Sequence, residues 1–91
     1  MPNPQTSIDT ADGSVKSGPG VVYWVLVSAA ATGGAWQLND STDDTGTDLL
    51  SGVAPANSMT FLDFTGAAIT FSSGIRADIP GSNITITTGY A

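Results

Sequence analysis

Apolar and polar residues alternate with a period of two over much of this chain, which is typical of β-strands that bury one face. The clearest examples are residues 35–39, 74–79 and 83–88, where an apolar side chain stands at every second position. Larger side chains at these positions, together with one from 58–64, predict the hydrophobic core: Trp36, Leu38, Phe61, Ile75, Ile84 and Ile86.

One segment, 21–28, is apolar at odd and even positions alike, so neither face of the strand that it predicts suits water. We expect one face to meet the opposite sheet and the other to meet a partner or a covering loop. The even positions carry Val22, Trp24 and Leu26, and these three are our candidates for partner contacts. Residues 58–64 have the same two-sided character and predict a second strand that is covered on both sides.

Turn-forming residues separate the apolar segments at short intervals. The chain holds 11 glycines and 5 prolines, among them the break Gly18-Pro19-Gly20 just before the strand at 21–28. Short strands with a turn signal about every 8–12 residues are the mark of a sandwich or a barrel. We therefore expect an all-β fold, a small β-sandwich of jelly-roll or immunoglobulin-like type, with six to eight short antiparallel strands over residues 15–91.

The first 14 residues have a different character, with two prolines, two aspartates and a single large apolar side chain, Ile8, after the initial Met1. Such a segment has no core of its own. We expect an extended N-terminal arm over residues 1–14 that becomes ordered on a neighbour, with Ile8 as its apolar contact. A frayed terminus is the alternative.

Composition excludes several classes of function. The chain has no His, Cys or Glu, and its only basic residues are Lys16 and Arg76. The groups that usually transfer protons or act as nucleophiles are therefore nearly absent, and we expect no enzyme and no cofactor. A formal net charge of −6 repels a phosphate backbone, so we expect no nucleic-acid partner. No apolar run reaches the ~20 residues that span a bilayer, and the N-terminus lacks a signal-peptide pattern, which predicts synthesis in the cytoplasm and no membrane partner.

Acidic side chains are the first candidates for binding chemistry. The acidic loop 40–48 has oxygen ligands that suit calcium, but its aspartates miss the spacing of an EF-hand and no Glu is present, so a solvated loop is favoured and no metal residue is assigned. Asp63 stands between two apolar residues, and we expect Arg76, Lys16 or backbone N–H groups to satisfy it.

Aromatic residues are the other candidates for ligand binding, because sugar rings stack on exposed aromatic side chains. The residues concerned are Tyr23, Trp24, Trp36 and Tyr90. Two of them stand on predicted strands as core residues do, so a role in the core or in an interface is favoured over a sugar platform.

A series of local motifs runs through the chain in order. A basic residue enters a Gly-marked strand at 16–27, a second strand at 36–40 ends on Asp, and a Pro-Ala loop at 53–58 precedes an Asp-Phe strand at 62–64. A Phe-x-x-Gly turn follows at 71–75. Together these motifs resemble small all-β virion proteins of tailed bacteriophages.

This resemblance implies a structural protein of the phage virion, acting as a capsid decoration or cement protein on the capsid surface. It also implies that the partners are the major capsid protein and further copies of the chain, most simply as a homotrimer. A host-surface carbohydrate-binding or attachment module of a head fibre or tail is the alternative.

Overall fold

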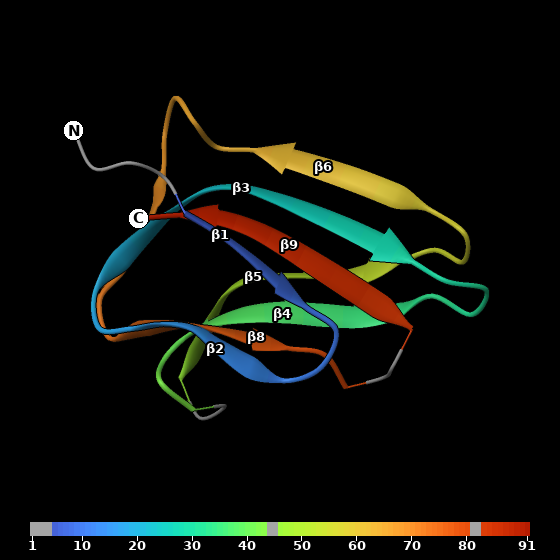
Figure 1. Ribbon diagram of the computed structural model, residues 1–91, viewed down its shortest axis with the longest axis horizontal. Helices are drawn as coiled ribbons and strands as arrows, with labels where there is room; N and C mark the ends of the chain where they lie inside the picture. Colours follow the sequence, from blue (N-terminus) through green and yellow to red (C-terminus); the bar gives the residue numbers. More distant parts are fainter. Residues whose placement is uncertain (1–4, 44–45, 81–82) are drawn as a thin grey trace.

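The computed structural model describes residues 5–43, 46–80 and 83–91. In this part of the chain nine strands form two antiparallel sheets that pack face to face (Figure 1). The strands are β1 (Gln5–Asp9), β2 (Gly13–Ser17), β3 (Gly20–Ala29), β4 (Gly34–Asp40), β5 (Thr47–Ala54), β6 (Met59–Asp63), β7 (Ile69–Phe71), β8 (Gly74–Asp78) and β9 (Ile84–Tyr90). The all-β sandwich predicted from alternation and turn spacing is therefore confirmed.

The two layers are a sheet A with the order β1-β9-β3-β6, in which β7 also pairs with β3, and a sheet B with the order β2-β8-β4-β5. In Figure 1 sheet A forms the upper layer and sheet B the lower one. The chain passes from β2 in sheet B to β3 in sheet A through the predicted turn, where Gly18 has a φ of 98°. Glycine adopts this backbone conformation without steric cost, so the residue type explains the turn.

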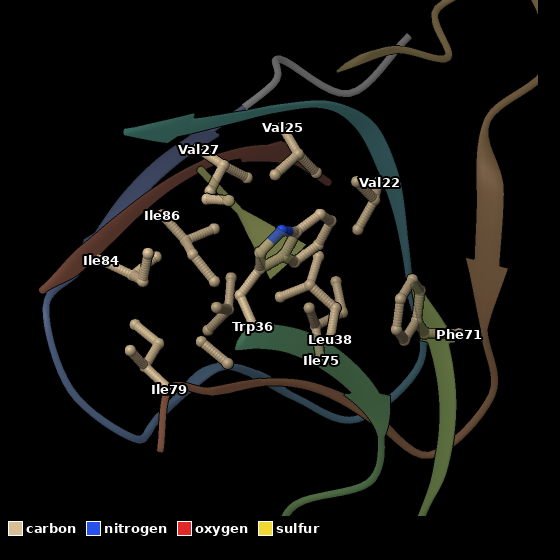
Figure 2. Packing of buried hydrophobic residues seen from close by; sticks show 13 residues of the cluster. Val22, Val25, Val27, Trp36, Leu38, Phe71, Ile75, Ile79, Ile84 and Ile86 are labelled. Atoms are coloured by element: carbon tan, nitrogen blue, oxygen red, sulfur yellow. The ribbon is translucent and has the colours of Figure 1, made fainter. Parts of the chain in front are cut away.

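The core lies between the sheets and is built from the alternating residues that face inward (Figure 2). Trp36 and Leu38 project from β4, Ile75 from β8, and Ile84 and Ile86 from β9, and all five are buried as predicted. Val25, Val27 and Phe71 complete the interior from sheet A. Both sheets therefore contribute one apolar face, as a two-layer fold requires.

Phe61 is the exception among the predicted core residues. It lies in β6 opposite Leu26 and is 58% exposed, whereas its neighbour Leu62 lies opposite the buried Val25. Both alternating sets of residues in 58–64 are apolar, so periodicity alone could not tell which set faces inward. Pairing with β3 decides the orientation, and it turns Leu62 toward the core and Phe61 toward solvent.

A β-bulge in β3 explains a second correction. Val22 lies opposite Tyr90 in β9, and Trp24 lies opposite Gly89, so Tyr23 is an extra residue in β3. An extra residue of this kind reverses the alternation of the strand. Val22 is therefore fully buried with the core residues of β3, whereas the register places Trp24 on the other side of the sheet.

The segment expected as an arm contains a strand of the sandwich. Gln5–Asp9 forms β1, which pairs with β9 of the same chain, and Gly13–Ser17 forms β2 in the other sheet. The described part of the segment 1–14 thus lies on its own domain, while residues 1–4 are outside the described residues. The strand has little hydrophobic signal because its inward residues, Ser7 and Asp9, are polar.

Candidate protein-interaction surface

The outward side of sheet A gathers the apolar side chains that the core does not use. Strand pairing places its residues in three rows, two of which cross β1, β9, β3 and β6, while the third crosses β9, β3 and β6. We call this surface the sheet A face, and its residues are Thr6, Ile8, Trp24, Leu26, Ser28, Met59, Phe61, Asp63, Thr85, Thr87 and Gly89. The middle row, Ile8, Thr87, Leu26 and Phe61, is the most apolar of the three.

Three large apolar side chains of the sheet A face are open to water in the single chain. Met59 is 71% exposed, Ile8 is 69% exposed and Phe61 is 58% exposed, while Trp24 and Leu26 are half-buried. Single exposed hydrophobic residues are normal on a protein surface, but contiguous ones mark contact sites. The pairing of Leu26 with Phe61 and of Ser28 with Met59 makes these residues neighbours.

The Trp24 ring lies against the sheet because its neighbour in β9 is a glycine. Trp24 lies opposite Gly89, and a Cβ added to Gly89 would overlap the indole ring. The ring centroids of Trp24 and Phe61 are 5.9 Å apart with a tilt of 41° between the ring planes. This spacing is typical of an aromatic pair, so the two rings pack against each other in the half of the β3 and β6 ladder that begins at Trp24.

Only one residue of the sheet A face, Asp63, carries a charge, and it lies at a corner of the face. Its carboxylate accepts hydrogen bonds from the hydroxyl and the backbone N–H of Thr65, with donor–acceptor distances of 2.5 and 3.0 Å. These bonds, the hydroxyl bond foremost, lower the pKa of Asp63 below its usual value. Of the possibilities expected for Asp63, a backbone N–H is one that the structure provides, and the residue is exposed.

The outward side of sheet B has a different composition. Its paired residues, which we call the sheet B face, are Ser14, Ala35, Gln37, Asn39, Asp48, Ser51, Val53, Arg76 and Asp78. Three of them are charged and four are amides or hydroxyls. Val53 is a large apolar residue of this face and is 77% exposed, and Leu49 of the same strand, β5, is also exposed. Asn39, by contrast, is buried. This face is therefore more polar than the sheet A face, and part of it is covered.

The predicted partner-contact residues fall on two sides of sheet A. Ile8, Trp24 and Leu26 come together on the sheet A face, although Ile8 was expected on a separate arm. Val22 lies in the core and has no exposed surface in this structure. Sequence reasoning missed Met59 and Phe61 as surface residues, although the two-sided apolar character of 58–64 was a usable signal.

Two carboxylates elsewhere in the described residues, those of Asp12 and Asp40, fix local structure by accepting hydrogen bonds. Asp40 accepts hydrogen bonds from the Ser72 hydroxyl at 3.0 Å and from the Ser73 backbone N–H at 2.7 Å, and the Ser73 bond is the main cause that lowers its pKa. Asp12 accepts the backbone N–H of Ile79 at 2.7 Å. No group of three possible metal-ligating acidic side chains is found within 5–43, 46–80 and 83–91, and part of the acidic loop considered for calcium, Asp44, lies outside these ranges.

Asp9 is the acidic side chain that faces inward from β1. It lies opposite Ile86 and is half-buried, and it accepts a hydrogen bond from the Ser7 hydroxyl at 3.0 Å. Burial raises the pKa of Asp9, and the Ser7 bond opposes this effect. The inner side of β1 is thus an unfavourable place for an ionised carboxylate.

Comparison with known proteins gives no relative of this chain: no family model, no curated protein and no solved structure matches it. Within the described residues no helix is long and apolar enough to cross a membrane.

Proposed function

We propose that this chain is a structural protein that acts by association rather than by catalysis, and that it decorates and stabilises the capsid of a tailed bacteriophage. The observation that carries the proposal is the sheet A face, whose large apolar side chains are left open to water in the described part of the chain. Contiguous apolar surface with polar surroundings is a feature of protein contact sites. The phage setting is supported by the sequence resemblance alone.

The chemistry of the side chains supports the same proposal. The sequence lacks the His, Cys and Glu residues that most often perform acid–base or nucleophilic catalysis. Asp12, Asp40 and Asp63 accept hydrogen bonds that fix local structure. In this role the chain needs no cofactor, and its partners are the major capsid protein and other copies of itself at the capsid surface.

A host-surface carbohydrate-binding or attachment module is the second candidate, and the pairing of the exposed Phe61 with the half-buried Trp24 favours it. Trp24 and Phe61 lie together on an open sheet face, as sugar-binding aromatics do. Their rings are tilted by 41°, however, so they offer no single flat platform for a sugar ring. The Asp63 carboxylate beside them is engaged by Thr65, which leaves the site poor in free polar groups that orient a sugar.

Cryo-electron microscopy of the phage particle that carries this chain tests the proposal. We expect density for the sandwich at quasi-three-fold or quasi-six-fold positions of the shell. We also expect particles that lack the coding sequence to rupture at a lower temperature than the parent particles. Density confined to the tail or fibres, with saturable binding of glycans by the purified protein, would support the second candidate. Purified phage particles that contain none of this protein, although the phage encodes it, would overturn both candidate functions.

A further inference from the structure

We infer that the sheet A face is the contact between two copies of this chain, which pack sheet on sheet around a two-fold axis. The inference rests on the proposed function, since it names the partner of the same surface. It concerns the purified protein in the absence of a capsid, where it can be tested separately.

Charge distribution favours a second copy over a basic partner. The chain has a formal net charge of −6, yet the sheet A face contributes only Asp63, whose carboxylate is already hydrogen-bonded by Thr65. A basic partner recognises ionised groups that can pair with it, and this face offers almost none. The surface that best matches a face with apolar side chains and a single carboxylate is another face of the same kind, and a second copy supplies one.

Electrostatic repulsion does not distinguish the two faces by their formal charge. Two molecules with a net charge of −6 repel each other. The sheet B face carries Asp48, Asp78 and Arg76, and the sheet A face carries Asp63, so each face has one negative charge in excess. The sheet A face differs in that its carboxylate lies at a corner, away from the apolar middle row, so two copies can bring the middle rows together without placing charges between them.

The arrangement of the rows fits a two-fold contact. Phe61 and Ile8 lie at opposite ends of the middle row, with Leu26 and Thr87 between them. A two-fold axis that runs along the strands sets Phe61 of one copy over Ile8 of the other. It also places each Asp63 over Thr6 rather than over a second carboxylate or over Met59. Stacked sheets pack about 10 Å apart with strands crossing at about 30°, which such an arrangement allows.

A self-complementary face closes as a dimer. The trimer that the sequence resemblance implies requires two different surfaces on each copy, because a three-fold contact is heterologous. The stoichiometry of the free protein therefore separates the two arrangements.

Matched aspartate substitutions on the two sheets test the inference. We expect the full chain to sediment as a dimer without capsids. Phe61→Asp places a carboxylate in each half of the contact, and we expect it to raise the dimer dissociation constant at least about 100-fold. Val53→Asp adds the same charge to an apolar position on the sheet B face that is more exposed than Phe61, and it is expected to leave the dimer unchanged. Met59→Asp, at a position that is 71% exposed, provides a second variant with little risk to the fold.

The response to salt gives an independent readout. Because both copies are acidic, added salt screens their repulsion, and we expect the dimer to tighten between about 50 mM and about 500 mM NaCl. Binding to a basic partner weakens over the same range. The sign of the salt effect thus distinguishes the two kinds of contact.

Cross-linking locates the contact, since the chain has no cysteine of its own. Thr87→Cys, in the middle row, is expected to give a covalent dimer with a bismaleimide that reaches about 10 Å, the spacing of stacked sheets. Ser51→Cys on the sheet B face is the control, and we expect it to give no covalent dimer with the same reagent.

A monomeric or trimeric wild-type protein, or a Phe61→Asp and Met59→Asp pair that both fold and remain dimeric, would overturn the inference. The proposed function is tested by a different result, the binding of the protein to capsids. A dimer that never binds capsids leaves the inference standing, whereas a monomer that decorates capsids overturns the inference and leaves the proposed function intact.

Discussion

The two sheets differ in their outer faces far more than in their inner ones. Toward the core, sheet A contributes Val25 and Ile86 while sheet B contributes Leu38 and Ile75, all fully buried. Toward the outside, sheet B presents mostly amides, hydroxyls and charged groups together with the exposed Val53, whereas sheet A presents aromatic and aliphatic side chains with hydroxyls between them. The outer face of sheet B is thus the more polar of the two, and that of sheet A is the better suited to contact with another protein.

The largest expected effect separates the inner from the outer apolar residues. Leu38 is fully buried in sheet B, and Leu38→Ala is expected to lower the free energy of unfolding by about 2–5 kcal/mol, a large share of the stability of a small domain. Leu26 faces outward from sheet A, and Leu26→Ala is expected to cost the single chain about 1 kcal/mol or less. Urea unfolding at a protein concentration low enough to keep the chain monomeric measures both values. Equal losses would mean that Leu26 belongs to the core.

The next effect concerns the glycines that lie beside the two tryptophans. Gly89→Ala forces the Trp24 ring away from the sheet, and we expect self-association to weaken about tenfold with a loss of stability of about 1–2 kcal/mol. Gly52→Ala approaches Trp36 inside the core, where the nearest ring atom would lie 3.1 Å from the new Cβ. That substitution is expected to change unfolding but not association. Sedimentation and urea unfolding of the two variants make the comparison, and an unaltered dimer in Gly89→Ala would show that Trp24 has no part in the contact.

The smallest effect lies at β1, where the inner side of sheet A is polar. Because burial raises the pKa of Asp9, the folded state favours the protonated carboxyl, and stability falls as pH rises from below about 4 through the raised pKa. Asp9→Asn removes this penalty while keeping an acceptor for Ser7. We expect its melting temperature to rise by about 1–2 °C at neutral pH and to match wild type near pH 3, a small change because Asp9 is only half-buried.

Calorimetry of Asp48→Asn controls for the change in net charge, because it removes the same charge from an exposed position on the sheet B face. An equal gain in both variants would assign the effect to net charge alone.

Much of the fold could be predicted from the sequence, because inward residues of β4, β8 and β9 alternate strictly with polar ones. Alternation alone was enough to assign Trp36, Leu38 and Ile84 to the core. β1 could not be predicted in this way, since an edge strand is held by backbone hydrogen bonds and its inward residues are Ser7 and Asp9. Hydrophobic periodicity carries no signal for such a strand.

The candidate surface was only partly predictable for a related reason. A strand that is apolar on both sides indicates that something covers its second face, which is how Trp24 and Leu26 were identified. The pattern does not say which face is which, so Phe61 was assigned to the core. Nor does it reveal the extra residue at Tyr23, so Val22 was grouped with Trp24. Register and bulges are properties of the paired strands rather than of either strand alone.

The bulge at Tyr23 has a consequence for how this surface evolves. Tyr23 is the residue of β3 that has no counterpart in the β9 register, so a single-codon deletion that removed it would leave Val22 opposite Tyr90 and Trp24 opposite Gly89. The strand would become regular at this point, and Trp24 and Leu26 would keep their outward orientation. A deletion within the regular pairing from Trp24 to Ser28 would instead shift the residues that follow by one position and exchange their inward and outward side chains. The bulge is thus a point at which β3 can lose a residue without loss of the surface, whereas a change in length further along the strand would abolish part of it.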